Sequence, residues 1–213
     1  MHWRALTFAF LLLLAAGTAA QEATPDEGRF TARDAHQGVT IAVRALSDVA
    51  EAEALFGKDA APVRAGLLAV EMHVVNQRAG AITINLNRIK ILRDGDQLAP
   101  VTPEEAALRL YPPPEGRVPD LGPRRLPIPG GPKMPKDKKR SEREETEASL
   151  ASRQFRARNI PPGGQALGFL YFDLGEVGTD LTGAHLYIPE VNDTATDEGL
   201  LFFEIALAPP ETP

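Results

Sequence analysis

The chain has 213 residues, a length that suits one domain with appendages. It contains no cysteine, which excludes a disulfide framework, a thiolate metal site and a cysteine nucleophile. Its 29 acidic and 23 basic residues give a net charge of −6, so a general nucleic-acid binder is not expected. The hydrophobic share of 43% is sufficient for a packed core.

The first 20 residues have the pattern of a secretory signal peptide. Arg4 precedes an apolar run over 5–16, and small residues follow up to Ala20, after which we expect cleavage. The run is shorter than the ~20 residues that cross a bilayer. No later segment approaches that length, so we expect an exported periplasmic or secreted protein with no transmembrane segment after cleavage.

Residues 21–38 are polar and predict a flexible leader. The strict alternation of apolar residues over 39–45 predicts a strand with one buried face. A short helix is then expected over 48–56, with Ser47 or Asp48 as its N-cap and Gly57 as its terminator.

Further strands are expected over 68–76 and 82–87. A change of phase at Ile89 predicts a bulge or a new strand, and Asp94-Gly95 is a hairpin signal. Thr102 followed by Pro103 predicts a helix start. That helix should run only to about Leu110, because three prolines follow it.

A Pro-rich, charged insertion is predicted over 112–154. Nine of the 29 residues from 112 to 140 are proline, which indicates an extended, solvated loop. Residues 141–154 are rich in Glu, Ala and Arg and predict a marginal helix that forms only when docked.

Strand signals return after Phe155. Residues 167–172 predict a strand buried on both faces, and shorter strands are expected over 184–188 and 200–207. In the last of these, four residues should face inward: Leu201, Phe203, Ile205 and Leu207. About seven short strands predict an all-β sandwich: a single domain over 39–208, interrupted by 112–154, with a flexible tail at 209–213.

Several of these segments are similar to immunoglobulin-like β-sandwich domains of small bacterial secreted or envelope proteins of unassigned function. The stretches that carry the resemblance are 66–76, 89–95, 160–164, 168–172 and 201–207. The resemblance implies an immunoglobulin-like antiparallel fold and an envelope setting, and it carries over no catalytic residue.

Glu71 and His73 are two residues apart on a predicted strand and therefore share a face, as an acid–base pair or metal site would require. His185 could join them. The favoured interpretation is a solvated outer face, with a metal-dependent hydrolase as the alternative. Similarly, the acidic stretch 192–199 could hold Ca²⁺, but a polar turn explains it better. No serine-nucleophile or phosphate-loop motif is present, and we expect no cofactor.

The charge distribution suggests a partner. Eight basic and two acidic residues lie between 117 and 140, a net charge of +6 on an otherwise acidic chain. The favoured interpretation is a solvated spacer or a loop that lies along its own acidic body. The alternative is contact with an anionic surface or acidic protein, for which the expected residues are Arg124, Arg125, Lys133, Lys136, Lys138, Lys139 and Arg140.

The function that these patterns favour is a non-enzymatic interaction module of the cell envelope. An envelope-assembly or chaperone-like component that offers an edge strand to a client is a further alternative.

Overall fold

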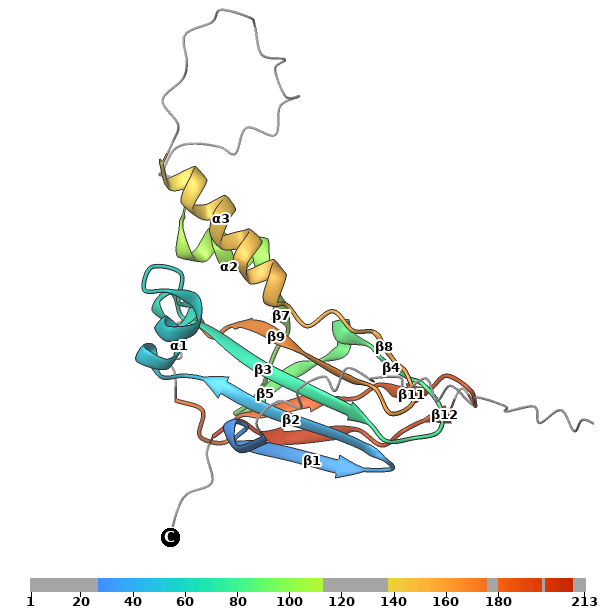
Figure 1. Ribbon diagram of the computed structural model, residues 1–213. Helices are drawn as coiled ribbons and strands as arrows, with labels where there is room; N and C mark the ends of the chain where they lie inside the picture. The colour runs from blue at the N-terminus through green and yellow to red at the C-terminus, as the bar shows by residue number, and fades with distance from the viewer. Residues whose placement is uncertain (1–26, 113–137, 176–179, 197, 209–213) are drawn as a thin grey trace, which may run out of the picture.

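The computed structural model describes residues 27–112, 138–175, 180–196 and 198–208 (Figure 1). The expected signal peptide and flexible tail lie outside the described residues. So do Arg124, Arg125, Lys133 and Lys136 of the basic segment.

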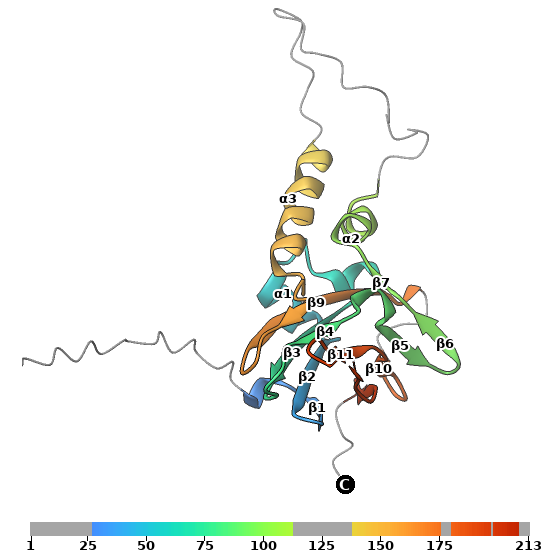
Figure 2. The same ribbon diagram turned by 90° about the vertical axis from the view of Figure 1, so that its right-hand side faces the viewer.

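Within the described residues the fold is mostly β, with three antiparallel sheets that form a sandwich-like body and three α-helices at one end of it (Figures 1 and 2). The five-stranded sheet has the order β1 (Ala32–His36), β2 (Val39–Leu46), β3 (Leu67–Asn76), β9 (Gln165–Asp173) and β7 (Pro100–Val101). One four-stranded sheet has the order β13 (Phe203–Ala206), β10 (His185–Ile188), β5 (Lys90–Arg93) and β6 (Asp96–Leu98). The other has the order β12 (Glu198–Gly199), β11 (Val191–Asp193), β4 (Ile82–Ile84) and β8 (Asn159–Ile160).

The two four-stranded sheets are built largely from the same stretches of chain. β4 leads into β5 through the 3-10 turn η3 (Leu86–Arg88), β10 leads directly into β11, and β12 leads into β13. The three stretches, β12–β13, β10–β11 and β4–β5, follow one another in this order across both sheets. The described part therefore has thirteen strands where the sequence predicts about seven, because breaks divide longer extended stretches. The change of phase predicted at Ile89 is confirmed, since it falls between η3 and β5.

The main core lies between the five-stranded sheet and the two smaller sheets. It contains residues from both sides of the insertion in the sequence, such as Ile41 and Met72 before it and Phe172 and Phe203 after it. Hydrophobic burial between the layers is the dominant stabilising term in such a sandwich.

β3 is the centre of the larger sheet. It pairs antiparallel with β2 over eight positions and with β9 over nine. Every residue of β3 except Val75 is buried, because the layered core covers one face and other segments cover the opposite face. A strand with no solvated face can carry buried polar side chains only where they find partners.

The helices cover one end of the outer face of the five-stranded sheet. α1 (Val49–Phe56) begins at Asp48, whose side chain accepts a hydrogen bond from the Glu51 backbone N–H, and ends at Gly57. α2 (Pro103–Leu110) begins with a capping box between Thr102 and Glu105. Both predicted helices are confirmed. A 3-10 turn, η2 (Pro62–Ala65), precedes β3.

α3 (Lys138–Arg153) lies beside α2 and projects away from the sheets (Figures 1 and 2). It begins three residues before the helix that the sequence predicts, so Lys138, Lys139 and Arg140 are helical and do not belong to an extended loop. Thr146 and Leu150, one helical turn apart, are its buried residues, and the Leu150 carbonyl accepts a hydrogen bond from the Tyr171 hydroxyl.

The prediction of a flexible leader over 21–38 is wrong for 27–38, the part of it that the structure describes. Residues 27–29 form the 3-10 turn η1 (Glu27–Arg29), and β1 forms the edge of the five-stranded sheet. β1 was missed because its sequence is short and polar. Its pairing with β2 through the Gln37-Gly38 turn, where both residues have positive φ, stabilises it instead.

Candidate functional site

Glu71 lies at the centre of a buried ion cluster on the outer face of β3. Its side chain is only 5% exposed; one carboxylate oxygen accepts a hydrogen bond from Arg29, and the other accepts one from Arg44 at 2.8 Å. Arg44 also donates to Glu51 of α1 at 2.9 Å. The prediction that this face is solvated is wrong: Arg29, from the turn before β1, and Arg44, on β2, lie against the carboxylate, and their two guanidinium groups compensate its charge.

His73 is also buried, 6% exposed, and makes contacts that hold its ring in place. Its Nε2 donates to the Gln165 side-chain oxygen at 3.0 Å, and its ring stacks on Phe30 with 5.6 Å between centroids. Arg29 in turn lies 5.1 Å from the centre of the Phe30 ring. Glu71 and His73 therefore share a face, as the sequence predicts, but each is engaged by a different set of neighbours.

His185 does not join them. It lies on β10 in a different sheet, where its Nδ1 donates to Glu204 on β13 at 2.7 Å. Among the described residues, no group of three or more His, Asp or Glu is arranged to hold a metal ion. The three residues of the predicted hydrolase site thus lie on two different sheets.

The acidic loop at 192–199 is organised around Asp193, which is buried. Its carboxylate accepts hydrogen bonds from the backbone N–H of Ala195 at 2.9 Å and from the Arg78 guanidinium at 3.0 Å. These bonds, the Ala195 one foremost, lower the pKa of Asp193 below its ordinary range. Arg78 also donates to the Gln37 backbone carbonyl, so Asp193 ties this loop to the β1–β2 turn.

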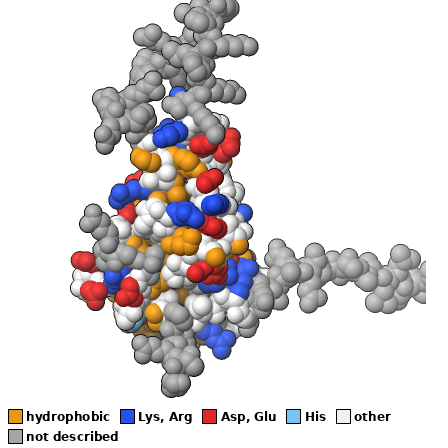
Figure 3. Space-filling view, turned by 90° about the vertical axis from the view of Figure 1, so that its left-hand side faces the viewer, with side chains coloured by type: hydrophobic (Ala, Val, Ile, Leu, Met, Phe, Trp, Pro, Cys, Tyr) orange, Lys and Arg blue, Asp and Glu red, His pale blue; other side chains and the backbone are white. Residues whose placement is uncertain are grey.

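Two side chains of the predicted basic contact can be located. Lys139 and Arg140 are exposed in the first turn of α3, far from the sandwich core, and Arg140 pairs with Glu144 one turn along the helix. The acidic residues that follow in α3 partly balance this charge. On the face of the molecule shown in Figure 3, basic and acidic side chains are interspersed.

Two adjacent apolar side chains are exposed just before β13, on the layer that the four-stranded sheets form. Leu201 is 62% exposed and Phe202 is 51% exposed, the two highest values among the large hydrophobic residues that the structure describes. The Phe202 ring lies 5.5 Å from the ring of Tyr187 on β10. We refer to Leu201, Phe202 and Tyr187 as the Leu201–Phe202 surface.

The inward orientation predicted for Leu201 is wrong, whereas Phe203, Ile205 and Leu207 are buried as predicted. Alternation of side chains between faces would bury Leu201 together with Phe203, but β13 begins only at Phe203, so the alternation does not extend back to Leu201. The signal in the sequence is the run Leu200-Leu201-Phe202-Phe203, in which four consecutive apolar residues cannot all lie on one face of a strand. Here Leu200 and Phe203 are buried, and the two residues between them face solvent.

The backbone of the exposed pair is held in place by the β1–β2 turn. The Leu201 backbone N–H donates to the Gln37 side-chain oxygen at 2.8 Å. His36 Nε2 donates to the Phe202 carbonyl at 3.2 Å, and the His36 ring stacks on Phe203 with 3.9 Å between centroids. The apolar side chains are therefore presented from an anchored backbone.

Comparisons with known proteins provide no relative: searches of protein-family models, of curated proteins and of solved structures found no match to this chain. None of the helices in the described ranges is long and apolar enough to span a membrane.

Proposed function

We propose that this protein is a non-enzymatic interaction module that is exported to the cell envelope or the medium and binds a partner protein through the Leu201–Phe202 surface. The observation that carries the proposal is the exposure of two adjacent large apolar side chains on an anchored backbone. Apolar and aromatic side chains gathered on a surface are typical of protein-binding sites.

The anchoring matters for affinity. A partner that buries Leu201 and Phe202 does not have to order their backbone first, because Gln37 and His36 already fix it. The entropy lost on binding is correspondingly smaller. Tyr187, which contacts Phe202, extends the apolar area onto β10 and supplies a hydroxyl for a polar contact at its rim.

The proposal of a non-enzymatic protein is supported by the engagement of the candidate acid–base side chains with neighbouring residues. Both oxygens of Glu71 are engaged by arginines, and the His73 ring is held by Gln165 and Phe30. The immunoglobulin-like character of the sandwich is also part of the proposal, and two antiparallel layers around a shared core support it.

A second candidate is an envelope-assembly or chaperone-like role through an edge strand. β1 is the outer strand of the five-stranded sheet, so one side of its backbone does not pair within that sheet. A client strand could add there by main-chain hydrogen bonds.

Site-directed photocross-linking tests the first candidate. A photoreactive benzoyl-phenylalanine replaces Phe202 in the full chain, which is then irradiated in envelope extracts of the source cell. We expect one discrete protein adduct, and we expect Leu201→Ser in the same chain to reduce its yield. The matched control carries the photoreactive residue in place of Leu108, which is exposed on α2.

Equal adducts from both positions, or none from position 202, would contradict a partner at this surface. The edge-strand role is tested separately by the same residue in place of Ala35, which is exposed on β1. An adduct from that position alone would favour the second candidate.

A further inference from the structure

A pocket of about 270 Å³ lies on the outer face of the five-stranded sheet, at the part of that face that the helices leave uncovered. Its lining comes from the segment before β1 and from β1, β2 and β3, and includes Phe30, Arg33, Thr40, Ala42 and His73. This volume is close to the lower end of the roughly 300–1,000 Å³ typical of small-molecule sites. We refer to it as the Phe30 pocket; it is distinct from the Leu201–Phe202 surface.

The sheet is hollow here because β2 carries small side chains between larger ones. Ala42 pairs with Arg33 on β1 and with His73 on β3, so the three side chains form one row across the face. In the next row, Thr40 lies between Ala35 and Val75. The larger neighbours form walls around a floor of Ala42 and Thr40.

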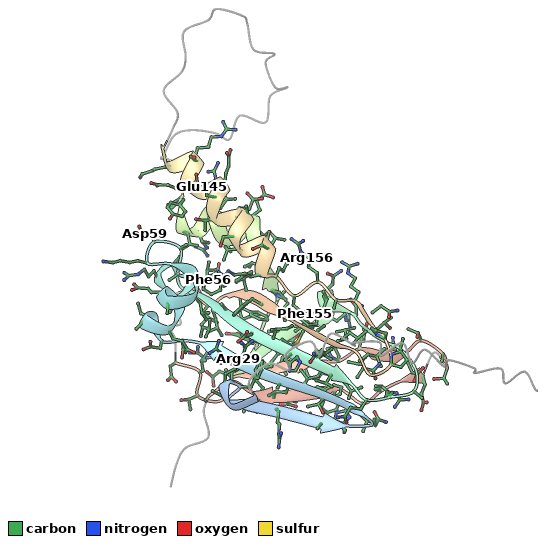
Figure 4. All side chains as sticks on the ribbon, viewed as in Figure 1. Arg29, Phe56, Asp59, Glu145, Phe155 and Arg156 are labelled. Atoms are coloured by element: carbon green, nitrogen blue, oxygen red, sulfur yellow. The ribbon has the colours of Figure 1, made fainter. Side chains whose placement is uncertain are left out.

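Phe30 forms a further wall of the pocket. It stacks on His73, and the bond from His73 to Gln165 fixes the imidazole beneath it. Arg29, labelled in Figure 4, packs on the Phe30 ring and pairs with Glu71. The aromatic wall is thus held by the buried ion cluster and is in place without a ligand.

Among the described residues, one charge in the lining of the pocket has no partner of opposite sign. The neighbouring cluster is balanced, since two arginines, Arg29 and Arg44, pair with Glu71 and Glu51. Arg33 is exposed at the mouth of the pocket, and its side chain pairs with no other described residue. Asp34, next to it, is opposite Ile41 and projects from the other face of the sheet.

We propose that the Phe30 pocket binds a small monocarboxylate with an apolar body. The apolar body lies on Ala42 and Val75 against the Phe30 ring, and the carboxylate pairs with Arg33 at the mouth. One free guanidinium favours a single anionic group over a polyanion such as a phosphate ester. The Thr40 hydroxyl, also in the lining, supplies a second hydrogen-bond donor.

Octanoate is the probe for this proposal. Titrated into the ¹⁵N-labelled mature chain, it should shift the amide signals of residues 30–33, 40–42 and 73–75 saturably. Octan-1-ol, which has the same chain and no charge, should bind about tenfold more weakly or worse, because it cannot form the charge-assisted bond to Arg33.

Two variants test the two parts of the site. Arg33→Ala removes the cation and should weaken octanoate binding about tenfold while leaving octanol binding unchanged. Ala42→Leu fills the floor and should abolish the binding of both, with retention of the remaining amide spectrum showing that the chain is folded. Arg156→Ala is the matched control, since Arg156 is exposed on the segment after α3 (Figure 4) and should leave binding unchanged.

The proposal is overturned by three results: no saturable shift with octanoate, equal affinity for octanoate and octanol, or unchanged binding by Ala42→Leu. Should Ala42→Leu fail to fold, Arg33→Ala together with the octanol comparison still decides the question, because Arg33 is exposed on an edge strand. None of these measurements depends on a protein partner, so they stand apart from the cross-linking test.

Discussion

Gly168 on β9 has no room for a side chain. A Cβ at this position would lie 2.5 Å from the Cα of Phe155, because the chain leaving α3 passes directly over the strand there. The crossing lets Phe155 enter the core, where it is 1% exposed (Figure 4), and its backbone N–H donates to the Phe169 carbonyl at 2.9 Å. Absence of a side chain at one residue thus decides how the chain after the insertion rejoins the sandwich.

Gly168→Ala should therefore destabilise the protein by about 1–3 kcal/mol, the usual cost of overpacking a filled site. Urea unfolding followed by far-UV circular dichroism measures the change in the free energy of unfolding. Gly199→Ala is the matched control, because the nearest atom to its added Cβ is 3.5 Å away, at an ordinary contact distance. Equal effects of the two substitutions would show that the chain at Phe155 does not pack closely against Gly168.

Asp193 makes the stability of the folded protein depend on pH in the acid range. Its carboxylate is stabilised in the folded state by Ala195 and Arg78, so the pKa is depressed below its ordinary value of 3.8. A carboxylate whose pKa is depressed in the folded state contributes stability at pH values above its unfolded pKa. That contribution is lost as the pH falls through 3.8 towards the lower pKa of the folded state.

We therefore expect Asp193→Asn to lower the urea midpoint at about pH 7 and to lower it less at about pH 3, because part of the contribution of the ionised carboxylate is lost once the pH is below the ordinary pKa of 3.8. Asp94→Asn serves as the control, since the Asp94 side chain is 81% exposed. A difference between wild type and Asp193→Asn that stays constant with pH would contradict the role of the ionised form.

At the scale of elements, α3 is attached to the sandwich mainly near its C-terminal end. Leu150 packs with Phe56, Phe169 and Tyr171, and the Tyr171 hydroxyl bonds to the Leu150 carbonyl. Burial raises the pKa of Tyr171, so this hydroxyl keeps its proton and remains a donor. Arg153 adds a contact with the Phe56 ring at 5.5 Å. Glu145, nearer the start of the helix, is exposed (Figure 4).

Leu150→Ala should consequently cost about 2–5 kcal/mol, the range for truncating a buried leucine to alanine. Hydrogen exchange should quicken along α3 and at the contacting part of α2 while β3 keeps its protection. Leu108→Ala makes the same change at an exposed position of α2, and we expect less than about 1 kcal/mol for it. If exchange quickened equally in β3, the helix would be an inseparable part of the core.

For the whole molecule, the main feature is one core built from both sides of the insertion. Ile41 and Met72 precede it and Phe172 and Phe203 follow it in the same buried cluster, and β3 pairs with β9 along nine residues. The contacts that hold the sandwich together are therefore long-range in sequence.

Limited digestion with trypsin tests this arrangement. From the basic and proline content of the sequence we expect early cleavage between Arg117 and Arg143, and we expect the two products to elute together on sizing because they share the core. Dissociation of the products without denaturant would indicate that each part buries its own hydrophobic residues.

The sequence by itself determined the local features of this protein. Alternation over 39–45 and 68–76, the caps at Asp48 and Thr102, and Gly57 as terminator depend on neighbouring residues, so β2, β3, α1 and α2 could be predicted. The sharing of a face by Glu71 and His73 follows equally from strand periodicity.

Only the tertiary structure decided which faces are covered. Glu71 and His73 are buried because Arg29 and Phe30, from a segment expected to be a leader, lie over them. Leu201 is exposed because the Gln37 turn holds its backbone outside the core. These contacts join residues between 42 and 164 positions apart. Local sequence patterns record the periodicity of one strand, whereas burial depends on which distant segment packs against it.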